Sequence, residues 1–284
     1  MTVIVPTSEF FTTSSGTKLH FLQVGPRHGT LLLCLHGLGG SSSTFLPLLT
    51  HLPPTYHTIL IDFPGFGSTP TPPSTQTLSI ASHVADLDDL IAHLQGPSKD
   101  NVVIVGHSLG AIVGLHYAAS NPENIAGVAL LGAGRAAGHI PAVRQRMLDL
   151  ANSVRNNGIG HAANIAAISN FYENSPDRIV SAEAREEVRK AVTASDPEGY
   201  ARTCEAVVDL GHRDPEYGNI LAPVVYVAGD KDGISPIERS NDLSKLMGGK
   251  SWVEVVRSGH QPILEDLMGV RRAIDGLFEV VEKL

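Results

Sequence analysis

Short apolar runs recur along this chain, and segments of helical periodicity separate them. Two runs flanking Ser15-Gly16, Phe10–Thr13 and Lys18–Val24, form a hairpin-like pattern at the start. The later runs, rich in Val, Ile and Leu, are Leu31–Leu35, Ile59–Ile61, Val102–Val105, Val128–Leu131, Val224–Val227 and Val253–Val256. Runs this short and apolar are typical of strands buried on both faces of a parallel sheet.

Helical patterns occupy the intervals between these runs. The clearest places Ile80, Val84, Leu87, Ile91 and Leu94 on one stripe. A second helix is predicted over Ser108–Ser120, ended by Asn121-Pro122, and a last one over about Leu267–Val281. Strands that alternate with helices predict an α/β fold with right-handed crossovers.

The alternation is interrupted after Leu131. Residues 135–219 contain only helical patterns and turns, such as Val143, Met147, Leu150 and Val154 at helical spacing. The simplest interpretation is a helical insertion over an α/β core. We therefore expect a first core segment at 1–134, a helical cap at 135–219 and a second core segment at 220–284.

Composition narrows the classes of function. The formal net charge is -8 and no Lys/Arg block occurs, which argues against nucleic acid or an anionic membrane as partner. Residues Met1 to Phe11 lack the pattern of an export signal, so we expect a cytoplasmic protein. The 13 histidines and two cysteines form neither HExxH nor CxxC, so no metal site is expected.

Gly106-His107-Ser108-Leu109-Gly110 is a GxSxG motif between an apolar strand and a helix. A serine on a tight strand-to-helix turn tolerates no bulky neighbours, and its hydroxyl projects above the strand ends. The start of the helix behind it favours developing negative charge. Ser108 is therefore the predicted nucleophile.

A serine hydroxyl needs a base to take its proton. His260 follows the run Val253–Val256, which places it at the carboxyl end of a strand, where sites in open α/β sheets gather. His212, in the insertion, fits this role less well. The acid that orients the imidazole should come from Gly229-Asp230-Lys231-Asp232, after Val224–Val227, and either aspartate could serve.

Acyl transfer also needs N–H donors for an oxyanion. Leu109 offers one at the helix start, and Leu38, in the glycine-rich turn His36–Gly40, offers a second. We interpret His36 as a scaffold residue of this turn. Gly37, Gly39 and Asp62 resemble a dinucleotide fingerprint only weakly, because Ser42 stands at the third glycine position.

Taken together, these motifs resemble the α/β-hydrolase superfamily over nearly the whole chain. They are HGLGG at 36–40, DFPGFGST at 62–69, GHSLG at 106–110, GDKD at 229–232 and SGH at 258–260. The resemblance implies an eight-stranded, mostly parallel sheet flanked by helices, with a helical cap inserted after strand six. It also favours Asp232 as the acid, since the superfamily's acid commonly ends a G-x-x-D pattern.

Within the superfamily the chain is similar to the 3-oxoadipate enol-lactonases and neighbouring lactonases and esterases, on residues 195–206 and 220–223. If this second resemblance holds, Arg135 at the cap entrance could hold a substrate carboxylate, although a surface arginine is the plainer interpretation. Four further residues are candidates for the pocket or for the cap's own core, namely Met147, Phe171, Tyr172 and Val207.

The expected function is hydrolysis of a small carboxylic ester or lactone through an acyl-enzyme on Ser108, with His260 as base, Asp232 as acid and no cofactor. The alternatives are a ligand receptor of the strigolactone type with slow or no turnover, and a C–C bond hydrolase of ring-cleavage products. The expected partner is the small substrate alone. The sequence favours neither a monomer nor a homodimer.

Overall fold

The computed structural model describes residues 5–96 and 101–283. Residues 1–4 and 284, at the outer ends of the two predicted core segments, lie outside the described residues, as do 97–100. Eight strands form one sheet in the order β1-β2-β4-β3-β5-β6-β7-β8. They are β1 (Thr7–Thr12), β2 (Lys18–Val24), β3 (Leu31–Leu35), β4 (His57–Asp62), β5 (Val102–His107), β6 (Ile125–Leu131), β7 (Val224–Gly229) and β8 (Ser251–Val256).

The sheet is mostly parallel. Strand β2 runs antiparallel to both of its neighbours, β1 and β4, and every later pairing from β4 to β8 is parallel. Each predicted run lies in a strand, but β1 ends at Thr12 rather than at Thr13. The reason is that Thr13 enters the hairpin turn, where its N–H donates to Thr17 O and its hydroxyl to Asp86.

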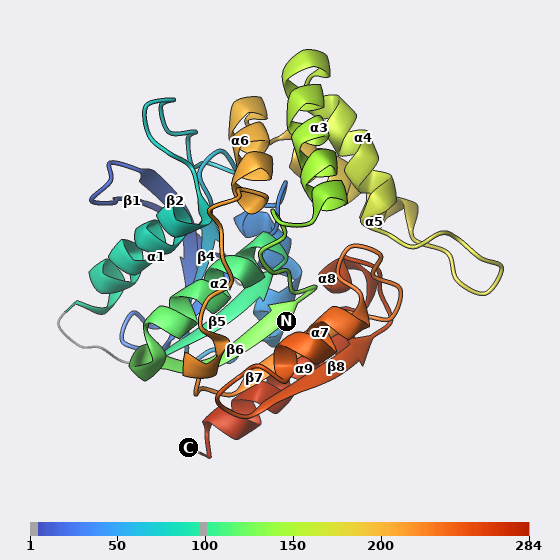
Figure 1. Ribbon diagram of the computed structural model, residues 1–284. Coiled ribbons are helices and arrows are strands. Elements are labelled where there is room, and N and C mark those ends of the chain that lie inside the picture. The colour runs from blue at the N-terminus through green and yellow to red at the C-terminus, as the bar shows by residue number, and fades with distance from the viewer. Residues whose placement is uncertain (1–4, 97–100, 284) are drawn as a thin grey trace.

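Helices cover both faces of the sheet (Figure 1). They are α1 (Ile80–Gln95), α2 (Leu109–Ser120), α3 (Pro141–Asn157), α4 (Ile159–Ser169), α5 (Ala182–Thr193), α6 (Pro197–Val207), α7 (Ile237–Ser244), α8 (Pro262–Glu265) and α9 (Leu267–Val281), with 3₁₀ segments η1 (Ser42–His51), η2 (Pro122–Asn124) and η3 (Tyr217–Asn219). Within the described residues, none of these helices has the length and apolarity needed to span a membrane.

The alternation of side chains along each buried strand divides the core in two. In β3, Leu31, Leu33 and Leu35 pack in one cluster with α1 and α2, whereas Leu32 and Cys34 pack in a second cluster with η1 and α9. Both faces of the strand are therefore apolar, as expected for a parallel strand between two helical layers.

Four helices, α3 to α6, lie between β6 and β7 in the chain and gather above the sheet (Figure 1). We call these helices the cap. Their inner faces, for example Val154, Val188 and Tyr200, belong to the same apolar cluster as α1 and α2. The architecture is the predicted eight-stranded sheet with a helical insertion after the sixth strand. The segment limits at 134 and 219 stay predictions.

Candidate active site

Ser108 lies at the junction between β5 and α2. Its φ of 51° makes it the only residue other than glycine with a positive φ in the described part of the chain. A non-glycine residue rarely adopts this backbone conformation, so surrounding contacts must hold it there. Ser108 N–H donates to Leu131 O over 3.0 Å, and Ser108 O accepts from the N–H groups of Ala111 and Ile112. The side chain is half-buried, which leaves the hydroxyl reachable.

The two glycines of the GxSxG motif are required by close backbone approaches. A Cβ on Gly106 would lie 2.6 Å from Gly110 O, and a Cβ on Gly110 would lie 2.0 Å from Leu35 O. Neither contact can relax easily, because both partners are backbone atoms. These approaches give the physical reason for the motif, as the strand-to-helix turn predicts.

The structure brings Ser108, His260 and Asp232 into one hydrogen-bonded chain. Ser108 Oγ lies 3.0 Å from His260 Nε2, and His260 Nδ1 lies 2.7 Å from Asp232 Oδ2. In the tautomer that suits a base, Nδ1–H donates to the carboxylate and Nε2 accepts the serine proton. Asp230, the alternative acid, instead accepts from Arg178 Nη1 over 2.6 Å.

Asp232 is held in place by the backbone as well as by the imidazole. Its Oδ1 accepts from the N–H groups of Ile234 and Ser235, each over 2.8 Å. Burial acts to raise the pKa of Asp232, but the hydrogen bonds from His260, Ser235 and Ile234 outweigh burial and hold this pKa below its ordinary value. The carboxylate therefore stays ionised beside the imidazole.

The loop of His260 is tied to the core and to the cap. His107 Nε2–H donates to His260 O over 2.8 Å, and His260 N–H donates to Asn170 O, at the end of cap helix α4, over 2.8 Å. Burial, with His260 nearby, lowers the pKa of His107 to about 3, so His107 is neutral and serves as a hydrogen-bond donor. His212, the candidate base that fits less well, contacts His116 instead, with 3.1 Å between the Nε2 atoms.

The two backbone N–H groups predicted to bind an oxyanion have no acceptor within the described part of the protein. Within the described residues, neither the N–H of Leu38 nor that of Leu109 donates to a protein acceptor. His36 fixes the loop of Leu38, since its Nδ1–H donates to Gly37 O over 2.7 Å and its Nε2 accepts from Phe63 N–H over 3.0 Å. Burial lowers the pKa of His36, in keeping with this neutral tautomer.

Asp62, the acidic residue of the dinucleotide alternative, has its oxygens occupied. They accept from His20 Nδ1 over 2.7 Å, Ser42 N–H over 2.5 Å and Ser68 N–H over 2.8 Å. Asp62 is 1 % exposed, so it cannot reach a ribose hydroxyl. The carboxylate holds two segments of the protein together through these hydrogen bonds. This geometry does not support the dinucleotide alternative.

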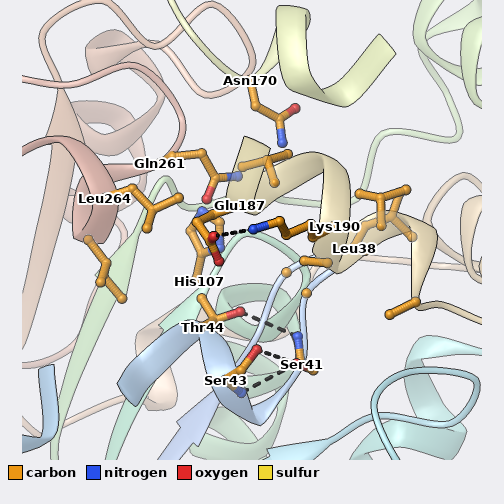
Figure 2. A pocket seen from close by; sticks show the side chains of 18 of the residues that line it. Leu38, Ser41, Ser43, Thr44, His107, Asn170, Glu187, Lys190, Gln261 and Leu264 are labelled. Atoms are coloured by element: carbon orange, nitrogen blue, oxygen red, sulfur yellow. Dashed lines mark hydrogen bonds and ion pairs between the residues drawn. The ribbon is translucent and has the colours of Figure 1, made fainter. Parts of the chain in front are cut away.

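A pocket of about 550 Å³ lies between the loop 37–41, the start of η1, helix α5 and helix α8 (Figure 2). Its wall at Gly37 adjoins Ser108, because a Cβ on Gly37 would lie 3.1 Å from Ser108 Cβ. Ser108 and His260 do not line it, but their chain neighbours His107 and Gln261 do, as does Leu38. Its other walls, including Thr44, carry no motif that sequence reasoning could have used. The spacing of apolar residues along a helix does not reveal which other element of the fold its side chains will face.

The five predicted pocket residues do not line this pocket. Arg135 Nε donates to Asp214 Oδ2 over 2.8 Å, so its guanidinium is already paired with a carboxylate. Phe171 is buried, and the Arg178 guanidinium stacks 4.1 Å from the Tyr172 ring centre. The two others, Met147 and Val207, pack against the core cluster. Phe171 and Tyr172 nevertheless lie against the His260 loop, since a Cβ on Gly259 would lie 3.0 Å from Phe171 Cα and 3.2 Å from Tyr172 N.

No group of three or more His, Cys, Asp and Glu side chains among residues 5–96 and 101–283 could hold a metal ion. The functional groups that the hydrogen bonds bring together are a hydroxyl, an imidazole and a carboxylate. Together these groups can carry a proton away from a nucleophile.

Comparisons with known proteins agree with this architecture. The model of the alpha/beta hydrolase fold family matches residues 30–267, and the chain belongs to that family. It is 24% identical over 271 residues to 3-oxoadipate enol-lactonase 2 of Acinetobacter baylyi, covering 94% of this chain and 95% of that protein. It is 36% identical to a serine hydrolase-like protein of Danio rerio, but over only 38% of this chain and 32% of that protein.

Solved structures show the same fold. An esterase from Thermogutta terrifontis superposes with a TM-score of 0.84 at 23% identity, covering 97% of this chain and 99% of that one. The enol-lactonase from Burkholderia xenovorans LB400 superposes with a TM-score of 0.81 at 20% identity, covering 95% of this chain and 100% of that one.

Proposed function

We propose that this chain is a serine hydrolase that cleaves a small carboxylic ester or lactone, with Ser108 as nucleophile, His260 as base and Asp232 as acid. The observation that carries the proposal is the hydrogen-bonded chain from Ser108 Oγ through His260 to Asp232. The similarity to an enol-lactonase over nearly the full length supports the substrate class.

The reaction has two halves. His260 Nε2 takes the hydroxyl proton as Ser108 Oγ bonds to the carbonyl carbon, and the carbonyl electron pair moves onto oxygen, where the N–H groups of Leu38 and Leu109 stabilise it. Asp232 stabilises the imidazolium that forms. When the carbonyl re-forms, the alkoxide leaves and takes the proton from His260. In a lactone this alkoxide stays attached to the acyl group.

In the second half His260 takes a proton from water, whose oxygen attacks the acyl-enzyme. A second oxyanion forms and collapses, the Ser108 Oγ bond breaks, and the proton returns to the serine. The products are a carboxylic acid and an alcohol. Neither half requires a cofactor.

Ser108→Ala tests the proposal. We expect kcat for p-nitrophenyl acetate to fall by about 10⁴-fold or more, because no other group replaces the nucleophile. Circular dichroism and the melting temperature should stay close to wild type. The matched control is Ser120→Ala, at the exposed end of α2. Undiminished hydrolysis by the Ser108 variant would refute the role of this residue.

A further inference from the structure

The pocket beside Ser108 has a charge pattern that selects among substrates. Apart from the neutral His107, its ionisable lining residues are Glu187 and Lys190 of α5. Glu187 Oε1 and Lys190 Nζ lie 3.1 Å apart and form an ion pair (Figure 2), and their side chains are 59% and 63% exposed. The cation among the lining residues is therefore solvent-exposed and already has a carboxylate partner.

The remaining walls are apolar or carry neutral polar groups. Leu38, Val188, Val192 and Ile263 supply apolar surface from three separate elements. The hydroxyls of the loop, such as that of Thr44, are engaged in the cap of η1.

Two amides, those of Asn170 and Gln261, point at the pocket from above α5 (Figure 2). Within the described residues, neither side chain has a hydrogen-bond partner in the protein. These amides can bind a neutral carbonyl or hydroxyl, because each offers both a donor and an acceptor.

We infer that this pocket binds an uncharged, largely apolar arm of the ester substrate, of medium length, and disfavours a carboxylate. The inference rests on the proposed function. A carboxylate placed here would lose water and gain no buried positive charge, since Lys190 is solvent-exposed and paired with Glu187, and Arg135 is paired with Asp214. A pocket of about 550 Å³ is within the range that holds small organic ligands.

A matched pair of esters tests the charge preference. We expect kcat/KM for mono-p-nitrophenyl adipate to be lower than that for p-nitrophenyl hexanoate by about tenfold or more, because the two differ mainly in the terminal carboxylate. Equal or faster cleavage of the adipate would overturn the inference. Such a result would leave the proposed function standing, since both esters require Ser108.

Ala191→Trp tests the location, because Ala191 is small and lines the pocket from α5. Filling the pocket should raise KM for p-nitrophenyl octanoate by about tenfold more than it raises KM for p-nitrophenyl acetate, because only the longer acyl chain extends into the pocket. Glu183→Trp, on the exposed face of the same helix, is the control. If octanoate and acetate respond alike to Ala191→Trp, the pocket is not the arm's site. Loss of acetate cleavage in Ser108→Ala shows separately that the proposed function holds.

A second, independent observation concerns the loop of His260. Glu265, the last residue of α8, accepts through Oε2 from Gly259 N–H over 2.9 Å and from Gln261 N–H over 3.4 Å. These are the residues directly before and after His260. With His260 N–H bound to Asn170 O, three consecutive N–H groups are bound to acceptors.

The Glu265 side chain is half-buried. Its Oε1 is buried and has no partner among the described residues, and burial raises the pKa of Glu265 to about 7. The charged groups that act on it are Arg178 of the cap and Asp232. A carboxyl group with a buried oxygen that lacks a hydrogen-bond partner is expected to have a function at this site.

The geometry points to Glu265 as a positioning residue that sets the orientation of the His260 imidazole toward Ser108 Oγ. Small errors in the placement of a base are costly, because proton transfer needs hydrogen-bond distance. Either ionisation state of Glu265 keeps an oxygen that can accept from the two N–H groups.

Glu265→Ala and Glu265→Gln together test this role. We expect Glu265→Ala to lower kcat by about tenfold to a hundredfold while KM stays within about twofold. Glu265→Gln should restore most of kcat, since the amide oxygen can replace Oε2. Wild-type kcat in the Ala variant would refute the role. Equal losses in both variants would also refute it, because they would show that the hydrogen bonds do not position the loop.

Discussion

Single residues at the site owe their identity to backbone geometry as much as to chemistry. Ser108 and Gly132, the residues that follow β5 and β6, both have a positive φ, at 51° and 55°. Gly132 lies directly beside the imidazole and the acid, and a Cβ there would come 3.0 Å from His260 Nδ1 and 3.2 Å from Asp232 Oδ2. The absence of a side chain at 132 is thus a condition for the distance between His260 and Asp232.

Gly132→Ala tests this condition. The added methyl must displace the imidazole or strain the backbone, so we expect kcat to fall by about tenfold to a hundredfold and the melting temperature to drop. The measurement is ester turnover beside thermal unfolding, with Gly134→Ala as control, since a Cβ at 134 meets only the flexible Ile112 side chain. Equal effects of the two substitutions would contradict the argument.

At the scale of elements, the cap is fixed to the core through α6 and the loop 69–77. Gly199 approaches Gly65 so closely that a Cβ on Gly199 would lie 2.6 Å from Gly65 Cα. Arg202 Nη1 donates to Pro72 O over 2.6 Å, and the same guanidinium also donates to Gln76 O.

The other end of the cap contacts the candidate active site, through the bond from His260 N–H to Asn170 O. Attachments to the core thus include α6 and the His260 loop, and Arg178, between α4 and α5, adds an ion pair with Asp230. The orientation of the imidazole depends on how α4 packs as well as on the sheet.

Across the whole molecule, buried histidines make stability depend on pH. His83 of α1 is 1 % exposed, neither of its ring nitrogens has a partner among the described residues, and burial, with His36 nearby, lowers its pKa to about 3. The pKa of His107 is likewise lowered to about 3. Below the unfolded value of about 6.5, the unfolded chain binds protons that the folded chain does not bind.

The free energy of unfolding should therefore be highest above about pH 6.5. It should decrease as the pH falls toward 3, by at most about 1.4 kcal/mol per pH unit for each such histidine. His83→Phe removes one of these groups, and we expect its urea unfolding free energy to depend less on pH between 7.5 and 5. The check is paired urea titrations of wild type and variant. If the unfolding free energies of wild type and variant depend on pH with the same slope, His83 does not contribute to the loss of stability at low pH.

The sequence by itself determined the fold and the approximate positions of the chemical groups. Runs such as Leu31–Leu35 and Val224–Val227 predict buried strands because their periodicity and length reflect local physics. The GxSxG motif predicts a serine that projects above the strand ends, because such a strand-to-helix turn tolerates no bulky neighbours. The structure adds that Gly106 is required by an approach within the turn and Gly110 by an approach to Leu35 of β3. The choice of Asp232 over Asp230 needed a resemblance to known proteins.

Only the tertiary structure decided which side chains meet across the chain. Arg135 pairs with Asp214, 79 residues away, and no local pattern predicts such a pair. No sequence pattern predicts the contacts of Glu265 either, because its partners depend on how α8 folds back on the His260 loop. The pocket, too, is formed between three elements that are distant in the chain. Periodicity shows which face of a helix is apolar, but the surface against which that face packs depends on the entire fold.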